Sequence, residues 1–376
     1  MSDPHLDVWH RELASRAREF GERHLRAIAP AEDDPAGRCA EVVAQLAAAG
    51  LLQAVVPPRF GSADARSIAV MRERLAYYSL AAESVFAAHG HAAHLLAAGG
   101  SEGQRARWLP ALAAGTSLGA LAVAEPEAGA DVGGIRTTAV SESGRWRLDG
   151  EKTWVTAAAR TRLVIVLARS EAGTTGTQGL SLFLVDGEAS DLTWRPFETT
   201  AALPVADLRL DGAPGALLGK VGAGAAAVES VLTLFRPGAA AAACGLAARA
   251  RDEAVRHALA RRQFGRALAA FQATKIAIAD MTAELLAAQR LATHAAWLVD
   301  QGAKDAARQA AAARVFATEA AARVTDLALR VHGSAGLVRG STVERLLREA
   351  RALRLREGTN ELLKMDLAQS IVEESR

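Results

Sequence analysis

An acidic residue beside a glycine is the first feature of this sequence that could do chemistry. Residues 355–361 read LREGTNE, with Glu357 directly before Gly358 and Thr359. A carboxylate on a loop between rigid elements can serve as a catalytic base, because loops carry many functional groups. The same residues also suit a plain link between two helices, in which Gly358 ends one helix and Thr359 caps the next. These residues alone leave both interpretations open.

A second group of residues could bind a cofactor. Residues 124–139, AEPEAGADVGGIRTTA, combine acids, a proline and several glycines, so the segment is expected to form an irregular loop. Such a loop exposes backbone N–H groups that can bind a cofactor or its phosphates. Trp154 follows within GEKTWVT, residues 150–156. A lone tryptophan usually belongs to a hydrophobic core, but beside a glycine-rich loop it can cover a flat ring.

Arginines precede an expected helix break farther along the chain. Residues 261–272, RRQFGRALAAFQ, place Gly265 inside a helical pattern, shortly after Arg261 and Arg262. Arginine at such a break can bind a pyrophosphate through two parallel hydrogen bonds. The stretch GKVGAGAAA contains a GxGxxA pattern at residues 222–227, but only helical sequence follows it. A dinucleotide-binding βαβ unit is therefore not expected here.

Two further patterns are interpreted as structural. The histidines of HGHAAH, His89, His91 and His94, lack a nearby cysteine or acidic partner, so we expect no metal site. Gly90 should interrupt the helix there, which would leave the histidines beside a cavity or on a solvated face. Arginines at every third position of ERLLREARALRLR predict a solvated or ion-paired helix face, because no aromatic residues are interleaved for base stacking.

The elements that must position these residues fall into three zones. Residues 1–118 and 226–376 have helical spacing, and residues 271–300 contain neither proline nor glycine. Between them, residues 119–225 contain β-type runs such as RLVIVLAR and LSLFLVD, separated by turn residues. We therefore predict a mostly α-helical protein with an N-terminal helical domain, a central antiparallel β domain and a C-terminal four-helix bundle.

Composition limits the class of protein. The 376 residues are 50% hydrophobic with a formal net charge of +2, which argues against nucleic acid or an anionic membrane as the main partner. Cys39 and Cys244 are far apart, which indicates a reduced, cytoplasmic protein. The first residues lack an apolar signal core, and no apolar run free of charges reaches the roughly 18–20 residues of a membrane span.

Six motifs occur in the order and spacing of the acyl-CoA dehydrogenases: AEPEAGAD, GEKTWVT, RRQFGRALAAFQ, RVHGSAG, VERLLREAR and REGTNE. They extend over nearly the whole chain, which therefore resembles this family. The resemblance implies the same three domains, with FAD bound between the β domain and the bundle. It also implies a homo-oligomer, usually a tetramer, in which a neighbouring subunit contacts the FAD, and an electron-transferring flavoprotein as electron acceptor.

The resemblance also assigns roles to residues. Glu357 matches the catalytic base, and its N–H helps to hold the thioester carbonyl. Some relatives carry the base directly before an arginine of the first bundle helix, but here Phe235 precedes the corresponding Arg236. Arg236 and Gly358 are expected to contact substrate. The expected FAD-binding residues are Trp154 and Thr156 at the flavin ring, Arg261, Gln263, Phe264, Gln272, Gly333, Arg330 and Ser334 towards a neighbouring subunit, and Ala124, Ala130 and Thr359.

Several of these positions depart from the family pattern. Ala124 stands where the family has threonine and Ala130 where it has serine, so two hydroxyl groups are missing. Arg330 and Ser334 replace glutamine and glycine, and Arg356 replaces the tyrosine before the base. Each lost hydrogen bond weakens binding by about 0.5–1.5 kcal/mol net. Backbone contacts need no side chain, so these losses do not exclude FAD.

The implied reaction is the α,β-dehydrogenation of an acyl-CoA thioester, in which Glu357 takes the α-proton and the flavin takes the β-hydride. A dry pocket should raise the pKa of Glu357 from about 4.3 towards neutrality, while Arg356 either opposes this shift or points away. Two alternatives stay open. One is the same chemistry on a thioester bound to a carrier protein. The other is a degenerate, non-catalytic partner subunit without FAD, which the altered contacts motivate.

Overall fold

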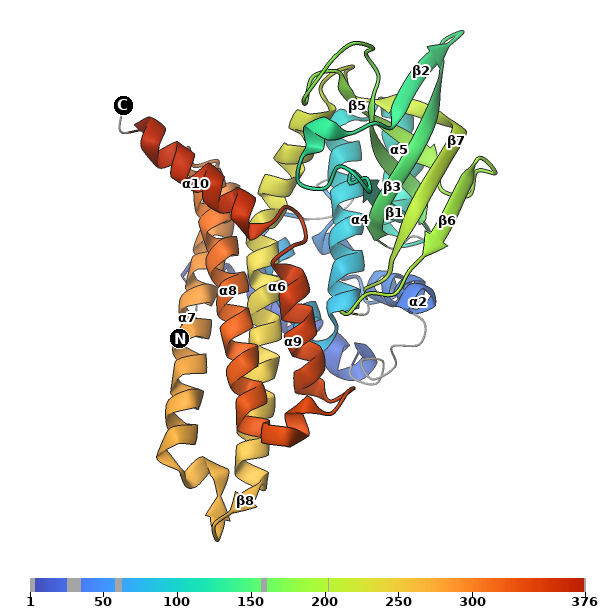
Figure 1. Ribbon diagram of the computed structural model, residues 1–376. Helices are drawn as coiled ribbons and strands as arrows, with labels where there is room; N and C mark the ends of the chain where they lie inside the picture. The colour runs from blue at the N-terminus through green and yellow to red at the C-terminus, as the bar shows by residue number, and fades with distance from the viewer. Residues whose placement is uncertain (1–3, 26–34, 58–62, 157–160, 202, 375–376) are drawn as a thin grey trace. The chain divides into compact units, whose positions relative to one another are not determined.

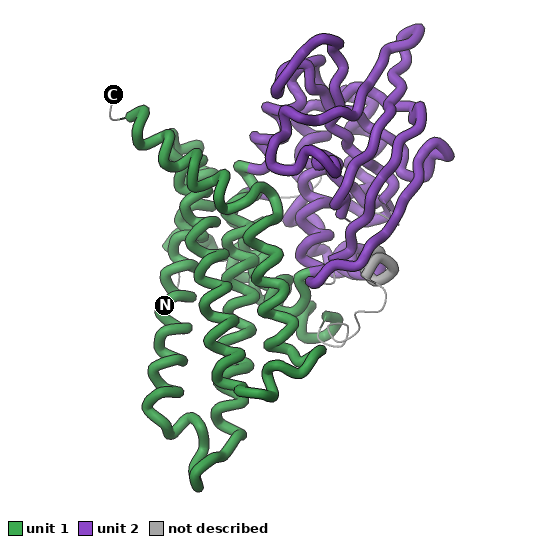
Figure 2. The backbone as a smooth tube through the Cα atoms, viewed as in Figure 1, with its two compact units in different colours: residues 1–31, 65–80, 233–376 green, residues 32–64, 81–232 purple. Residues whose placement is uncertain are grey.

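The chain divides into two compact units (Figure 2). The computed structural model describes residues 4–25, 35–57, 63–156, 161–201 and 203–374, and only the backbone of residues 35–40, so the side chain of Cys39 lies outside the described part. The unit that we call the helical unit comprises residues 1–31, 65–80 and 233–376, and the β unit comprises residues 32–64 and 81–232. The three domain ranges expected from the sequence stay a prediction.

Long helices rich in alanine form the helical unit (Figure 1). Its α-helices are α1 (Val8–Phe20), α3 (Ala65–Tyr78), most of α6 (Gly224–Ala260), α7 (Gln272–Asp300), α8 (Ala306–His332), α9 (Thr342–Leu353) and α10 (Asn360–Glu374). The range of α7 agrees with the uninterrupted helix expected at residues 271–300. Buried alanines recur every three or four positions along α8, at Ala310, Ala313, Ala317 and Ala321. Small side chains at this spacing let neighbouring helices pack closely.

Two sequence expectations can be checked on α6 and α9. Helix α6 is long and apolar enough to cross a membrane by length and composition, although it carries charged residues such as Arg236 and Arg249. Because 78% of its most apolar window is buried inside the protein, its hydropathy suits the core of a bundle. On α9, Arg345 pairs with Glu349 and Arg348 with Glu344, at 2.7 and 2.6 Å. The expected ion-paired face is therefore confirmed.

The β unit contains one seven-stranded sheet. Its strands are β1 (Leu118–Ala122), β2 (Thr138–Glu142), β3 (Arg145–Thr156), β4 (Thr161–Arg169), β5 (Leu180–Asp186), β6 (Leu192–Pro196) and β7 (Val205–Leu218). The order is β1-β4-β2-β3-β7-β5, β6 pairs with β7, and a further β4–β5 pairing closes the sheet on itself. Most pairs are antiparallel as expected, but β1 runs parallel to β4 over five residue pairs. The sheet is therefore mixed.

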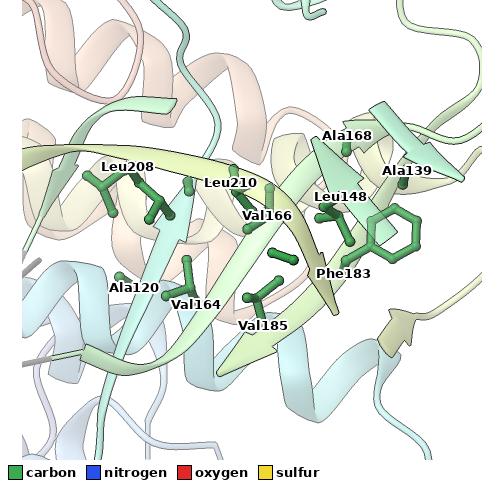
Figure 3. Close-up of a cluster of buried hydrophobic side chains, with 13 residues drawn as sticks. Ala120, Ala139, Leu148, Val164, Val166, Ala168, Phe183, Val185, Leu208 and Leu210 are labelled. Atoms are coloured by element: carbon green, nitrogen blue, oxygen red, sulfur yellow. The ribbon is translucent and has the colours of Figure 1, made fainter. Parts of the chain in front are cut away.

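A hydrophobic core fills the closed sheet (Figure 3). Val164 and Val166 of β4, Phe183 and Val185 of β5 and Leu208 of β7 all point into it and are fully or almost fully buried. Side chains alternate between the two faces of a strand, so every second residue of these apolar runs reaches this core. The GEKTWVT motif lies at the end of β3, a single strand of 12 residues.

The helices of the β unit are α2 (Pro35–Ala48), α4 (Leu80–Gly99) and α5 (Glu102–Ala113). Gly90 does not interrupt α4, so His89 and His91 are buried rather than solvated. Nε2 of His89 lies 3.1 Å from the Leu112 carbonyl oxygen, and burial lowers the pKa of His89 to about 4. Among the described residues, no three histidines, cysteines or acids are arranged to hold a metal ion.

Candidate active site

The loop between α9 and α10 carries Glu357. Helix α9 ends at Leu353 and α10 begins at Asn360. The hydroxyl of Thr359 accepts a hydrogen bond of 3.3 Å from the N–H of Leu362, which caps the first turn of α10. Gly358 has a φ of 91°, a value that suits glycine far better than any other residue. The linking role is therefore correct, and the question is what holds Glu357 between these two helices.

Glu357 is held by an arginine 285 positions earlier in the sequence. Nη2 of Arg72, on α3, donates to Oε1 of Glu357 at 2.7 Å, and Nη1 donates to Oε2 at 3.2 Å. The Arg72 side chain is fully buried, and that of Glu357 is 10% exposed. Nη1 of Arg72 also donates to the Phe235 carbonyl on α6, at 3.1 Å. A two-pronged contact at these distances orients the carboxylate and favours its ionised form.

The backbone at Glu357 is held by a second buried arginine. Nη2 of Arg314, on α8, donates to the carbonyl oxygen of Arg356 and, at 2.6 Å, to that of Gly358. The C=O of Arg356 and the N–H of Glu357 belong to one trans peptide and point in opposite directions. This clamp therefore aims the N–H of Glu357 away from Arg314. Glu357 itself has a φ of 54°, which is uncommon for a residue with a side chain.

Further positive charge surrounds this loop. A guanidinium nitrogen of Arg356 lies 3.9 Å from Oε1 of Glu357, so the alternative that Arg356 points away is wrong. Arg236, on α6, is buried, and its Nη1 donates to the Thr233 hydroxyl at 3.1 Å. Burial lowers the pKa of Arg314 to about 10, the Glu357 carboxylate opposes this shift, and the charges of Arg236, Arg72 and Arg356 add to it. Three guanidinium groups, those of Arg72, Arg314 and Arg356, thus act on the Glu357 carboxylate, and Arg236 acts on Arg314.

The glycine-rich loop of the β unit folds around Glu125. This buried carboxylate accepts hydrogen bonds from the N–H groups of Arg136 and Thr137, at 2.7 and 2.9 Å, and lies 2.8 Å from Nζ of Lys152. The carbonyl of Ala124 accepts from the N–H of Thr153 at 2.9 Å, which attaches the loop to β3. Ala124 is half-buried, whereas Ala130 is exposed. The loop is thus fixed from within, and its exposed part is free to face a ligand.

Trp154 stands out from the sheet at an irregularity in β3. The pairing of β3 with β7 shifts register between Lys152 and Val155, and Trp154 has a φ of 56°. A bulge of this kind turns a side chain away from the regular face of the sheet. The Trp154 ring is 53% exposed and meets Phe197 edge-on, with 5.2 Å between ring centroids. Thr156 follows, half-buried, opposite Val205 of β7.

The RRQFG segment forms a small hairpin between α6 and α7. Its strands are β8 (Arg262–Gln263) and β9 (Arg266–Ala267), where only a helix break at Gly265 was expected. Phe264 and Gly265 at its tip have φ values of 49° and 77°, as in a type I′ turn, and Phe264 is 92% exposed. The side chains of Arg261 and Gln263 are exposed as well, and so is Gln272 at the start of α7.

The remaining expected FAD-binding residues lie at the end of α8. Arg330, Gly333 and Ser334 are exposed there, and Gly333 ends the helix with a φ of 59°. His332 stacks on His257 of α6 with 4.3 Å between ring centroids, so this segment lies near the start of the hairpin. Within the helical unit, the hairpin and the loop after α9 lie at opposite ends (Figure 1). The structure thus separates the Glu357 group from the group expected to reach a neighbouring subunit.

Comparison with known proteins identifies the family. Sequence models of the N-terminal, middle and C-terminal domains of acyl-CoA dehydrogenase match residues 9–116, 120–212 and 222–372. A 3-(aryl)acrylate reductase from Clostridium sporogenes is 31% identical over 96% of this chain and 98% of its own. The chain belongs to the acyl-CoA dehydrogenase family. It is an enzyme of the oxidoreductase class, as the family and its solved structures support.

Solved structures of acyl-CoA dehydrogenases share the fold. Butyryl-CoA dehydrogenase from Megasphaera elsdenii is 26% identical, with a TM-score of 0.91 over 99% of this chain and 100% of that one. A glutaryl-coenzyme A dehydrogenase in complex with glutaryl-CoA is 27% identical, with a TM-score of 0.91 over 99% of this chain and 97% of that one. The fold expected from the sequence is therefore confirmed, with helical N- and C-terminal parts around a β domain.

Backbone with positive φ coincides with three of the expected site residues of this chain. Only Ser143, Trp154, Phe264 and Glu357 have positive φ among the described residues other than glycine. Three of these four are residues to which the sequence motifs assign the base, the flavin ring and the interface. Sequence reasoning missed Arg72 and Arg314, although both are charged residues on apolar helix faces, which is the pattern that could have marked them.

Proposed function

We propose that this protein catalyses the α,β-dehydrogenation of an acyl-CoA thioester, with Glu357 as the base. The observation that carries this proposal is the position of Glu357, which is strained, mostly buried and fixed by two arginines from different helices. Strain persists in a fold only where the surroundings enforce it, and it gathers at functional sites. A simple helix link needs none of these contacts.

FAD is the cofactor that we propose, because the family is one of flavoproteins and the residues present fit it. Trp154 offers an exposed ring that could cover a flat ring system, and exposed N–H groups of the glycine-rich loop could meet phosphates. The hairpin segment adds three exposed groups: the aromatic ring of Phe264, the guanidinium of Arg261 and the amide of Gln263. The other residues that would hold FAD are those assigned by the motifs: Thr156, Ala124, Ala130, Gln272, Arg330, Gly333, Ser334 and Thr359. When bound, FAD would supply hydride transfer.

The chain's own residues would do the proton chemistry. Glu357 would take the α-proton of the thioester on a carboxylate oxygen, which requires that oxygen to leave Arg72. The N–H of Glu357, aimed away from Arg314, would donate to the thioester carbonyl and stabilise the enolate as it forms. Gly358 lets the backbone approach the substrate closely, and Arg236 would contribute positive charge beside the carbonyl.

Assembly, partners and location complete the proposal. We propose a homotetramer or homodimer, because Phe264 and its neighbours on the hairpin are exposed and lie far from the Glu357 loop of the same chain (Figure 1). An electron-transferring flavoprotein would accept the electrons, in the cytoplasm. A relative that matches over nearly the whole chain is a reductase, and the same residues would serve the reverse reaction, with Glu357 returning the α-proton.

A thioester panel tests the proposal. The purified protein should be yellow and should oxidise one or more acyl-CoA thioesters when an artificial electron acceptor is supplied. Activity confined to thioesters on a carrier protein would favour the second alternative from the sequence. A colourless protein that takes up no FAD and acts on no thioester would instead favour the non-catalytic partner subunit.

A further inference from the structure

The first observation is that the fold makes room for Arg72 to reach Glu357. Arg72 crosses from α3 to the carbonyl of Phe235 on α6 and presents both of its terminal nitrogens to the Glu357 carboxylate. Gly238 of α6 leaves space for it, since a Cβ atom there would lie 2.8 Å from Cδ of Arg72. A buried arginine that binds a carboxylate through both of its terminal nitrogens is a built carboxylate site.

The second observation concerns donors that the fold leaves unused. Arg314 is 1% exposed, and Nη2 is the nitrogen that contacts the carbonyls of Arg356 and Gly358. Its buried Nε and Nη1 have no hydrogen-bond partner among the described residues. Buried donors normally have partners, so unused ones beside a functional loop point to a ligand that accepts hydrogen bonds.

These contacts conflict with the role of Glu357 as base. A carboxylate held by both of its oxygens on a guanidinium is oriented and weakly basic, so Glu357 has to leave Arg72 before it can take a proton. Its departure would leave a fully buried guanidinium without its carboxylate, which is strongly unfavourable. A neutral acyl chain offers nothing to replace that carboxylate.

We propose that Arg72 and Arg314 form a subsite for a second carboxylate, carried on the acyl chain of the substrate. This carboxylate takes the fork of Arg72 in place of Glu357, with Arg314 as an additional donor, and so releases Glu357 to act as base. The inference rests on the proposed function and defines its substrate class as short dicarboxylic acyl thioesters. The acyl chain has to be short because Arg72, which would receive its terminal carboxylate, already contacts Glu357. Glu357 in turn has to reach the α-carbon at the other end of the same acyl chain.

The replacement of the Glu357 carboxylate by the substrate carboxylate explains why arginine suits this subsite. A planar guanidinium binds either carboxylate with the same pair of parallel hydrogen bonds, so the buried charge keeps a partner throughout. The neighbouring charges of Arg236 and Arg356 further favour the arrival of an anionic chain. Substrate recognition and release of the base would thus be one event.

Binding to the anaerobic holoenzyme, measured by titration calorimetry, tests the subsite. The two probes are glutaryl-CoA and 5-methylhexanoyl-CoA, in which two methyl groups replace the two terminal carboxylate oxygens. We expect glutaryl-CoA to bind at least about tenfold more tightly, the lower end for charge-assisted hydrogen bonds. Equal affinities, or no binding of either probe, would overturn the proposal.

Variants identify the residue responsible. Arg72→Met should abolish the preference for glutaryl-CoA, and Arg72→Lys, which keeps the charge but not the fork, should lose most of it. Should Arg72→Met fail to fold, Arg72→Lys and Gly238→Ala, which crowds the Arg72 side chain, provide the same comparison. Arg323→Met is the matched control, because Arg323 forms an exposed pair with Glu284 in the same unit.

The outcomes separate this inference from the proposed function. A preference that survives in Arg72→Met, or is equally lost in Arg323→Met, would refute the subsite. Failure of every thioester to reduce the flavin, with the binding preference intact, would refute the dehydrogenase proposal and leave the subsite standing.

Discussion

Substitution of Glu357 by glutamine separates a catalytic base from a structural carboxylate. Glutamine keeps the shape of the side chain but cannot accept the α-proton. A positioned base contributes about 10²–10⁴ in rate, which corresponds to roughly 2.7–5.4 kcal/mol of transition-state stabilisation. We expect a loss at the upper end of this range, because an α-proton beside a thioester is weakly acidic and Arg356 and Gly358, the neighbours of Glu357, carry no carboxylate.

The ion pair with Arg72 adds a stability effect that the loop sequence alone does not indicate. The Glu357 carboxylate accepts two charge-assisted hydrogen bonds while its side chain is 10% exposed. Such bonds contribute about 1.5–3 kcal/mol each, against about 0.5–1.5 for a neutral acceptor, and the NH₂ group of glutamine cannot accept one at all. We therefore expect the free energy of unfolding to fall by roughly 2–4 kcal/mol, well beyond the ±0.5 kcal/mol typical of a surface site.

Because the variant changes both properties, a stability measurement alone cannot assign the role of Glu357. The decisive assay is anaerobic flavin reduction by stopped flow, at a temperature where the variant is folded, with an accepted thioester. Glu361→Gln serves as control, since Glu361 is the next acid and is exposed. The double variant Arg72→Met with Glu357→Gln removes both charges and should regain part of the stability without regaining the rate. Reduction within tenfold of the wild type in Glu357→Gln would remove Glu357 from the mechanism.

Three further predictions concern the cofactor and acid stability. Arg261→Ala should lower FAD content and shift the oligomer towards smaller species in gel filtration, and full flavin with unchanged size would contradict the interface role. Ala124→Thr combined with Ala130→Ser should slow FAD loss on dialysis, whereas faster or unchanged loss would mean that the hydroxyls have no place in this pocket. Burial lowers the pKa of His89 from 6.5 to about 4, so the folded state resists protonation. The contribution of neutral His89 to stability is therefore fully present above pH 6.5 and is lost as pH falls towards 4, and His89→Asn should flatten this slope in urea titrations at several pH values.

The sequence predicted most of the local structure because its signals are local. Strands β4 and β5 coincide with mostly apolar runs, and α7 coincides with a stretch free of glycine and proline. The errors arose where tertiary packing overrides a local preference. Gly90 lies inside α4, where a buried helix tolerates it, and β1 pairs in parallel with β4, which no local pattern specifies.

The partners of Glu357 were not predictable from the sequence. Arg72 lies 285 residues away from Glu357, and Arg314 reaches the loop from a third helix. The chain contains 44 lysines and arginines, so no local pattern singles out these two beyond their apolar neighbours. The REGTNE motif therefore identified the Glu357 carboxylate, whereas only the fold reveals that both of its oxygens are bound by Arg72.

The positions of backbone strain bear on whether this protein has lost its chemistry. Ala124 and Ala130 lack the hydroxyl groups of the threonine and serine in the family pattern. This loss on its own favours a degenerate subunit. Trp154, Phe264 and Glu357 nevertheless keep positive φ angles, each of which costs on the order of 1–3 kcal/mol. The φ of Phe264 suits the tip of its hairpin, but Trp154 lies inside a strand and Glu357 is additionally held by two buried arginines, so at these two positions the fold maintains a conformation that a connection alone does not require. The strained backbone at Trp154 and Glu357, together with the two arginines at Glu357, therefore supports an active enzyme rather than a degenerate subunit.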